Sequence, residues 1–238
     1  MNEQISKLVE LQELDLEMDA CIEELESIPE TIENLNTKIK NTKDSLEEKK
    51  KELNQLKIQC KEKEMDLTSK EQEIRKHKTE LNQVKTNEQY KSLLNQITNV
   101  EKEKDKIEEE LIKLMDKIEE FNLSLKENEK ICSEEITKLN KEISDLEIKK
   151  NELEQKITDQ KTKRKTFTDI IESVILKKYE YIRKAKDGIA IAPIENDSCG
   201  NCHIKLPPQT INEVYKEKDL VLCDNCSRIL YLKDETQK

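Results

Sequence analysis

The stretch KTNEQY, residues 85–90, decides the fold, because it separates two long segments that each keep an apolar repeat. Thr86 is followed three residues later by Gln89, which is the capping-box pattern that marks a helix start. Gly and Pro total only six residues in a chain of 238, so breakers are scarce and very long helices are expected. We therefore expect the chain to reverse direction near residues 83–88.

Upstream of this stretch, an apolar residue recurs at every seventh position from Leu25 to Leu81. This spacing keeps one stripe of a helix apolar and is the pattern of a coiled coil. A companion series three residues further on becomes half polar beyond Thr42, so we expect looser packing there. We interpret its Lys residues and His77 as snorkelling side chains or register devices rather than ligands. The repeat positions are Leu25, Ile32, Ile39, Leu46, Leu53, Cys60, Leu67, Ile74 and Leu81.

The phase of this repeat extends toward the N-terminus through Leu11 and Cys21, and it therefore runs through Pro29. Proline removes one helix hydrogen bond and clashes with the carbonyl four residues earlier. We expect either a kink near residues 27–29 or a fresh helix start, with Ser27 as N-cap and Glu30 closing a capping box.

Downstream of the reversal, a second apolar seam alternates steps of three and four residues from Ile97 to Leu125 and continues through Cys132 to Val174. A repeated four-residue step at Cys132 is a stutter, which should locally unwind the supercoil. A reversal near residue 86 leaves a short helical overhang beyond the paired region and before Gly188. The sequence therefore predicts a mainly α fold, in which residues 1–186 form a long antiparallel coiled-coil helical hairpin.

Charged residues make up 40% of the chain and aromatic residues only 3%, which suits a coiled coil better than a globular core. The formal net charge of −10 opposes non-specific attraction to nucleic acid or to anionic membranes. The basic run KTKRK, residues 161–165, should lie opposite the acidic N-terminal helix. We interpret it as a solvated ion-pair face, with contact to phosphate as the alternative. The opposing acids are Glu10, Glu13, Asp15, Glu17 and Asp19.

Neither an export signal nor a membrane span is visible, because no basic segment precedes an apolar one and nowhere do 18 apolar residues run together. We therefore expect a cytoplasmic protein that does not enter a membrane. In a reducing compartment, the seven cysteines suit metal binding and core filling better than disulfides. Cys21, Cys60 and Cys132 occupy coiled-coil core positions, and we interpret them as small apolar fillers.

The composition changes abruptly after Lys186, and residues 187–238 contain both Gly residues and two CxxC pairs. The first pair lies in CGNCH, residues 199–203, which could belong to covalent haem, to a thiol/disulfide cycle or to a metal site. About 50 residues cannot bury enough apolar surface to fold unaided, so such a segment needs a stabilising cross-link, such as a bound metal. Two CxxC turns can supply one, because their four thiolates complete a closed tetrahedral shell around zinc. The four cysteines are Cys199, Cys202, Cys223 and Cys226.

The other chemistries for CGNCH fit less well. Haem attachment needs export to an oxidising compartment and would leave the second CxxC pair without a purpose. A redox dithiol needs a βαβ setting and electropositive neighbours, and neither is visible. We therefore predict one structural Zn²⁺, with iron or an iron–sulfur cluster as the next alternative. His203 would then lie beside the metal, either donating to a cysteine sulfur or exposed to solvent.

The pattern within residues 187–238 predicts a small β-rich zinc ribbon. The segment IAIAPI at residues 189–194 is expected to form a strand, and residues 219–223 and 227–232 are expected to form two more around the second CxxC. Residues 206–216 suggest a turn and a short helix. The segment has more apolar residues than one small core should absorb, so some should contact the coiled coil or a partner. With four thiolates and one zinc ion, its net charge is about −5, whereas a ribbon that grips nucleic acid should be basic.

Three stretches resemble bacterial C4-type zinc-ribbon proteins with an N-terminal coiled-coil hairpin. They are KTNEQYKSLL at residues 85–94, GIAIAPIENDSCGNCHIKLPPQTINEV at 188–214 and LVLCDNCSRILY at 220–231. The resemblance implies a cytosolic zinc-binding adaptor with the four CxxC cysteines as ligands. It also implies partners such as the sigma-54 factor or components of flagellar gene expression and type III secretion. Some relatives are described as nucleic-acid binding, and this acidic ribbon, with Ser227 where many zinc knuckles carry Gly, departs from that role.

No nucleophile, base and orienting group converge in the sequence, so we predict a protein that is not an enzyme. The first hypothesis is an adaptor that binds protein partners along the coil and on the ribbon. The second is a nucleic-acid binding regulator that uses the ribbon and residues 161–165. The third is a purely structural spacer or self-assembling rod. The sequence makes no prediction of oligomeric state.

Overall fold

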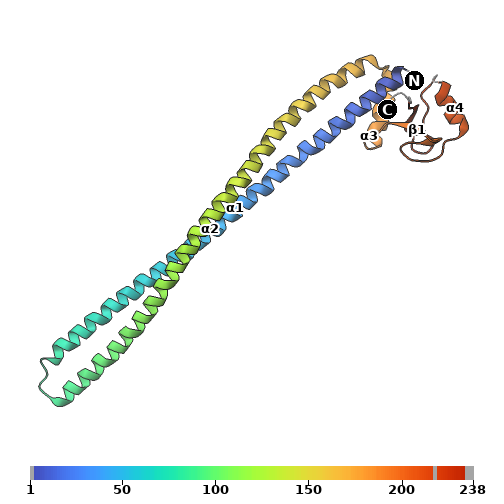
Figure 1. The fold of residues 1–238 in the computed structure, drawn as a ribbon. Coiled ribbons are helices and arrows are strands. Elements are labelled where there is room, and N and C mark those ends of the chain that lie inside the picture. Colours follow the sequence, from blue (N-terminus) through green and yellow to red (C-terminus); the bar gives the residue numbers. More distant parts are fainter. Residues whose placement is uncertain (1–2, 217–218, 234–238) are drawn as a thin grey trace. The chain divides into compact units, whose positions relative to one another are not determined.

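The chain is seen in a computed structural model that describes residues 3–216 and 219–233. The remaining positions of the two predicted segments, 1–2, 217–218 and 234–238, lie outside the described residues. The predicted class is confirmed, with two long antiparallel helices and a small C-terminal strand region (Figure 1). The elements are α1 (Glu3–Leu81), α2 (Asn87–Ile170), α3 (Ser173–Ala185), β1 (Ile191–Glu195), β2 (Ser198–Cys199), α4 (Pro208–Lys216) and β3 (Ile229–Leu232).

The chain divides into two compact units, Glu33–Ile143 and Met1–Ile32 with Ser144–Lys238. The first unit contains only the two long helices and the reversal between them. Thr86 Oγ1 accepts a hydrogen bond from the backbone N–H of Gln89 over 3.4 Å, which is the contact of an N-cap. All the predicted repeat positions of α1 in this unit are buried or half-buried, as the heptad pattern requires.

The polar seam positions of this unit form ion pairs that cross between the helices. Lys63 Nζ lies 2.7 Å from Glu110, and Lys70 Nζ lies 2.8 Å from Glu103. Such pairs favour one axial alignment of the two helices, so the interpretation of these lysines as register devices agrees with the contacts. His77 instead contacts Glu80 of its own helix over 3.2 Å.

Helix α1 continues through Pro29, so the alternative of a fresh helix start at Ser27 is wrong. The Ser27 hydroxyl donates to the carbonyl of Glu24 over 2.8 Å instead of capping a new helix. The neighbouring Ile28 is 3% exposed and packs in a cluster with Cys21, Leu153 and Ile157. This packing holds the helix together where proline removes a hydrogen bond. The kink near residues 27–29 stays a prediction.

The predicted overhang before Gly188 is helical, but it does not continue α2, because α2 ends at Ile170 and a separate helix, α3, follows. Ile171 is buried, as the seam predicted, but Val174 is 76% exposed. The backbone N–H of Glu172 donates to Oε1 of Gln4 over 3.1 Å, so a side chain at the start of α1 accepts a hydrogen bond from the backbone at the bend. Helix α3 then packs against α1, with Tyr179 in one core cluster with Leu8 and Leu11.

The ribbon contains a three-stranded sheet in the order β2-β1-β3, with β1 antiparallel to β2 and parallel to β3. The short helix predicted after the first CxxC is confirmed as α4. Residues 219–223 do not form the predicted strand and contribute only an isolated bridge from Leu222 to Ile229. Strand β1 begins at Ile191, two residues later than the sequence suggested.

Alternate residues of β1 and β3 serve two different cores, because neighbouring side chains in a strand point to opposite faces. Ala192 and Leu230 belong to the core cluster that contains Cys199, Cys223 and Cys226, with Cys202 packed against it. Ile191 and Ile229 face the other way and share a cluster with Leu8 of α1. The expectation that part of the ribbon's apolar surface contacts the coiled coil therefore agrees with the packing. Among the helices of the described ranges, none has an apolar stretch long enough to cross a membrane.

Candidate metal centre

The two CxxC segments form loops of the same geometry. In the first, the backbone N–H of His203 donates to the carbonyl of Cys199 over 2.8 Å, and His203 has a φ of 59°. In the second, the N–H of Ser227 donates to the carbonyl of Cys223 over 2.8 Å, and Ser227 has a φ of 60°. Each loop therefore turns back on its first cysteine through a left-handed residue, which directs both of its sulfur atoms to one point.

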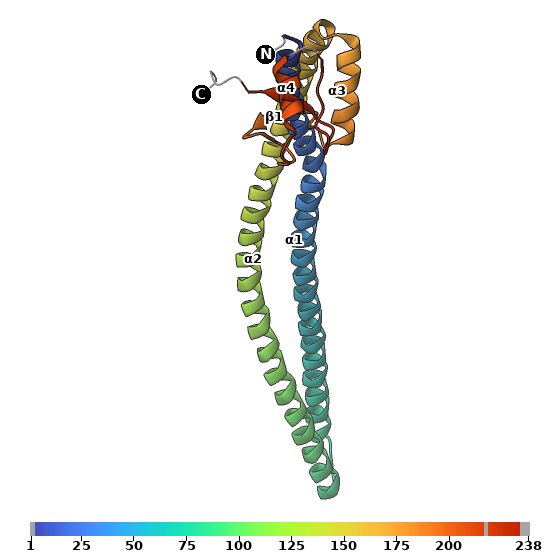
Figure 2. The ribbon, with the colours of Figure 1, turned by 90° about the vertical axis from the view of Figure 1, so that its right-hand side faces the viewer.

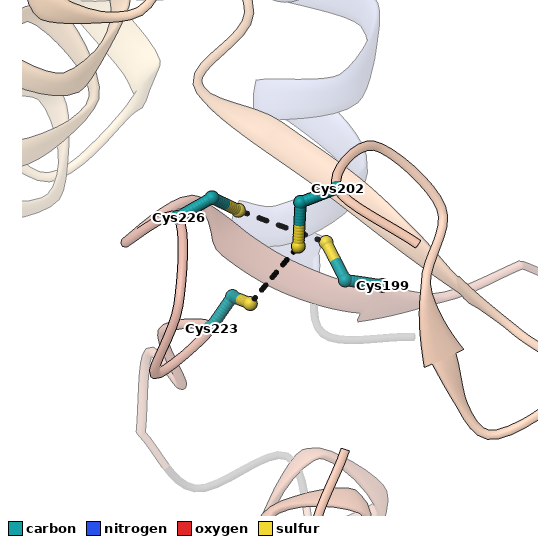
Figure 3. Close-up of side chains that lie close together, drawn as sticks. All are labelled: Cys199, Cys202, Cys223 and Cys226. Atoms are coloured by element: carbon teal, nitrogen blue, oxygen red, sulfur yellow. Dashed lines mark hydrogen bonds between the residues drawn. The ribbon is translucent and has the colours of Figure 1, made fainter. Parts of the chain in front are cut away.

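The four sulfur atoms lie together, with two from each loop (Figure 3). Cys199 Sγ is 3.8 Å from Cys226 Sγ, and Cys202 Sγ is 3.7 Å from Cys223 Sγ. All four lie within 4.8 Å of one another. A tetrahedral zinc with Zn–S bonds of about 2.3 Å requires sulfur separations of about 3.8 Å. A disulfide requires about 2.05 Å, so the arrangement fits a shared metal and not a pair of disulfides.

The protonation of these cysteines depends on burial and on backbone N–H groups. Burial raises the pKa of Cys199 to about 12, and it also raises the pKa of Cys223. The backbone N–H of Ile204 is the main cause that lowers the pKa of Cys202 to about 6. Without a cation, the raised pKa values keep the thiols of Cys199 and Cys223 protonated at neutral pH. A divalent metal supplies the positive charge that makes thiolates stable at these positions.

The geometry does not support the other chemistries proposed for CGNCH. Three of the four sulfurs belong to buried residues, and the ligand set is complete without solvent or substrate. The sulfurs of the second CxxC lie against those of the first. Covalent haem attachment uses only one CxxC pair and would give this arrangement no role. The side chain of His203 is exposed, and no hydrogen bond from it to a sulfur is found in the described ribbon. The solvent-exposed alternative for His203 therefore agrees with the structure.

Gly200 explains why the two loops differ in sequence, CGNC against CDNC. A Cβ atom at Gly200 would lie 2.8 Å from Cγ of Pro193 and 2.9 Å from its carbonyl oxygen. The N–H of Gly200 also donates to that oxygen over 2.7 Å. The first loop therefore lies directly on β1, and only glycine leaves room for the contact. The second loop carries Asp224 at the same position.

Sequence reasoning missed Gln12, which joins α1 to the ribbon. Its Oε1 accepts hydrogen bonds from the backbone N–H groups of Ala190 (2.7 Å) and Ile191 (2.8 Å). Its Nε2 donates to the carbonyl of Ile191 over 3.1 Å. One side-chain amide thus satisfies backbone groups at the start of β1, where β3 pairs with the strand but β2, which pairs only with Ile194 and Glu195, does not. A single glutamine among many polar helix residues gives no sequence signal for this role.

Asp15 is the centre of a buried polar cluster that also escaped the sequence analysis. It is fully buried, and its carboxylate accepts from Nε and Nη2 of Arg164 over 2.6 and 3.2 Å and from the hydroxyl of Tyr179 over 2.9 Å. Nε of Arg183 lies 3.3 Å away without forming a hydrogen bond. Arg164 also pairs with Glu180. Burial, followed by the negative charge of Asp15, raises the pKa of Tyr179.

The interpretation of residues 161–165 as an ion-pair face holds only for Arg164. Its partner Asp15 belongs to the acidic N-terminal helix, as expected. Lys161, Lys163 and Lys165 are exposed, and within the described residues none of them has an ion pair. The charge of these three lysines is therefore not neutralised by the acidic helix.

The fold and the site together define a zinc-ribbon coiled-coil protein. Residues 11–187 match the family described as the CT398-like coiled coil hairpin domain, and residues 198–230 match the C4-type zinc ribbon domain. The chain belongs to the CT398-like coiled coil hairpin family. A C4-type ribbon with four sulfurs this close together is consistent with one structural zinc.

Solved structures of bacterial proteins share this fold. CT398 from Chlamydia trachomatis is 25% identical, with a TM-score of 0.80 over 98% of this chain and 100% of that chain. A protein from Mycobacterium smegmatis is 20% identical, with a TM-score of 0.77 over 95% and 97%. The HP0958 protein from Helicobacter pylori is 22% identical, with a TM-score of 0.51 over 98% of both chains. No curated protein matches the sequence.

Proposed function

We propose that this protein is a non-enzymatic cytoplasmic adaptor that binds protein partners through its coiled coil and its zinc ribbon. The observation that carries the proposal is the closed cluster of four sulfurs in a ribbon that packs on α1, one of two long antiparallel helices. A four-cysteine zinc shell has no open coordination position, so its role is structural and not catalytic. The ligands of the proposed zinc are Cys199, Cys202, Cys223 and Cys226.

The arrangement of apolar side chains supports protein binding. In the ribbon, Ile204 is 47% exposed and Tyr215 is 65% exposed, although the same segment buries a dense core around the cysteines. Exposed apolar groups on a metal-stapled module are available to a partner. We propose residues 1–186 and 187–238 as the two functional segments. By the resemblance found in the sequence, the leading partner is a sigma factor or a flagellar or secretion component.

The second candidate is a nucleic-acid binding regulator, which the unpaired lysines at residues 161–165 favour. Against it stands the ribbon, whose charge with zinc bound is about −5. Binding to RNA and DNA oligonucleotides measured across a salt series separates the two functions. Affinity that survives physiological ionic strength and falls steeply with added salt supports the nucleic-acid role, whereas absence of such binding supports the adaptor.

The adaptor role is tested by capture of partners from a native lysate with the intact, zinc-loaded chain. Cys223→Ser is the matched variant, because it removes one sulfur without shortening the chain. Truncation after Lys186 is a poorer choice, since it would uncover Leu8 and Leu11, which pack against the ribbon. We expect specific partners with the intact chain and weaker recovery with the variant. Sedimentation of the chain alone as oligomers, with no partner recovered, would instead support a self-assembling spacer.

A further inference from the structure

The segment from Lys161 to Lys186 has a charge opposite to that of the whole chain. It contains nine Lys and Arg residues against three Asp and Glu residues, a net charge of +6 in a protein of −10. Arg164 and Arg183 are neutralised internally, by Asp15 and Glu180 and by Asp19. The seven lysines that remain have no ion pair within the described residues, and they are Lys161, Lys163, Lys165, Lys177, Lys178, Lys184 and Lys186.

Helix α3 concentrates part of this charge on one exposed face. Val174 and Tyr181 are 76% and 77% exposed, which makes them the most exposed large apolar side chains of the described chain. They are seven residues apart and therefore lie on the same side of the helix. Lys177 and Lys184 are exposed three residues after each of them. We call Val174, Lys177, Tyr181 and Lys184 the outer face of α3.

The opposite side of α3 is already occupied. Tyr179 and Ile182 are buried against Leu8 and Leu11 of α1, so the helix is held firmly with its outer face free. In Figure 2, one long side of α3 (orange) faces no other described element. With 13 residues at about 1.5 Å each, α3 offers a surface about 20 Å long, enough for three turns of a second helix.

The composition of the outer face selects the kind of partner. Apolar residues at a seven-residue spacing with lysines beside them form half of a helix–helix seam whose flanks require acidic groups. A membrane is a poorer fit, because only two apolar side chains remain for insertion. Nucleic acid is also a poorer fit, since Val174 cannot stack on a base. A second copy that used this same face would bring lysines against lysines.

We propose that the outer face of α3 is a docking surface for an acidic helical segment of a partner protein. This proposal rests on the adaptor role and adds to it the place and the chemistry of recognition. The lysines attract the acidic flanks of the segment, and Val174 and Tyr181 pack against its apolar stripe. Because the charges are solvent-exposed, the affinity should decrease as salt is added.

The probe for this surface is a fluorescent peptide of about three heptads, with Leu at the a and d positions and Glu at e and g. A peptide of the same composition in scrambled order is its control. The zinc-loaded full chain is compared with two charge-reversed variants, Lys177→Glu with Lys184→Glu, and Lys126→Glu with Lys130→Glu. Both pairs lie on exposed, unpaired positions of the described helices and change the net charge equally. Tyr181→Ala tests the apolar contribution.

We expect the patterned peptide to bind the wild-type chain, and the Lys177→Glu with Lys184→Glu variant to weaken it about tenfold or more. Lys126→Glu with Lys130→Glu should change the affinity less than about threefold. Helical circular dichroism and zinc content check that each variant is folded. Equal loss in both variants, equal binding of the scrambled peptide, or no peptide binding would overturn the proposal. The proposal would also be overturned if the Lys177→Glu with Lys184→Glu variant lost more affinity for phosphatidylserine vesicles or for an oligonucleotide than for the peptide.

The same variants separate this proposal from the adaptor role in the lysate experiment. If the wild-type chain captures a partner and the α3 variant captures it equally well, the docking surface is wrong and the adaptor role stands. If the wild-type chain captures none, the adaptor role itself fails.

Discussion

The cluster around Asp15 leads to the sharpest prediction for stability. Asp15→Ala removes a buried carboxylate from Arg164 and Tyr179 and leaves Arg183 without a close negative neighbour on that side. Breaking a buried ion pair by removing one partner costs about 3–5 kcal/mol. Arg164 keeps Glu180 and Arg183 keeps Asp19, so we expect a loss of about 3 kcal/mol, the lower end of that range.

The loss should appear locally, because every partner of Asp15 lies near the packing of α3 on α1. Native-state hydrogen exchange is therefore the better assay, since a single unfolding midpoint is not well defined for a chain of two compact units. A loss of about 3 kcal/mol corresponds to roughly a hundredfold faster exchange of the protected amides of α3. Amides in residues 33–143 should exchange as in the wild-type protein.

Asp19→Ala is the matched control. Asp19 also pairs with Arg183, over 2.6 Å, but its side chain is 43% exposed. Exposed ion pairs contribute about 0–1 kcal/mol, so this variant should accelerate exchange by about fivefold at most. If both variants changed the exchange of α3 equally, or if neither did, the buried cluster would not be what fixes α3 to α1.

Four further predictions concern the ribbon. Cys223→Ser should abolish stoichiometric zinc binding, measured by elemental analysis, and should raise the rate of hydrogen exchange in the ribbon and in α3. Circular dichroism should retain most of the helix signal. Loss of most of that signal would show that the long helices depend on the metal. Gly200→Ala should destabilise the ribbon by about 1–3 kcal/mol, because the new Cβ meets Pro193, whereas Asp224→Ala should have little effect; chelator competition reports both, and equal effects would contradict the contact. Ser227→Gly should stabilise the ribbon by up to about 1 kcal/mol, because its φ of 60° suits glycine, and a lower zinc affinity would argue against this. Zinc uptake near pH 7 should release at least about two protons, since the pKa of Cys199 is raised to about 12 and that of Cys223 is also raised. The zinc affinity should then fall about a hundredfold for each pH unit of acidification. An indicator titration that detects no proton release would refute this prediction.

The sequence was most informative where one physical rule governs a long stretch. The seven-residue repeat through Leu53 and Ile74 placed the seam of α1, because a helix must bury its apolar stripe wherever its partner runs alongside. The CxxC spacing identified the four sulfurs for a similar reason, since two intervening residues allow both thiolates to reach one metal. Both patterns are local, so they could be read without knowing the rest of the fold.

The end of α2 could not be read in this way. The apolar steps continue from Phe167 through Ile171 to Val174, and no Gly or Pro interrupts them. At this point the chain turns back, and Ile171 and Tyr179 pack in one core cluster with Leu8 and Leu11 of α1. No local pattern marks contacts between residues so far apart in the sequence. Asp15 was similarly hidden, because a buried acid in a helix looks like any other surface acid until Arg164 and Tyr179 are brought to it.

The contacts of Gln12 and Asp15 also bear on how the chain is made. Asp15 meets Arg164 after 149 positions and Gln12 meets Ile191 after 179, so the first turns of α1 leave the ribosome long before their partners exist. Closing so long a loop is slow relative to helix formation, and Leu8 and Leu11 stay uncovered in the nascent chain until then. We therefore expect metal binding by residues 199–226 to help cover Leu8 and Leu11, which are synthesised long before the ribbon strands that pack on them.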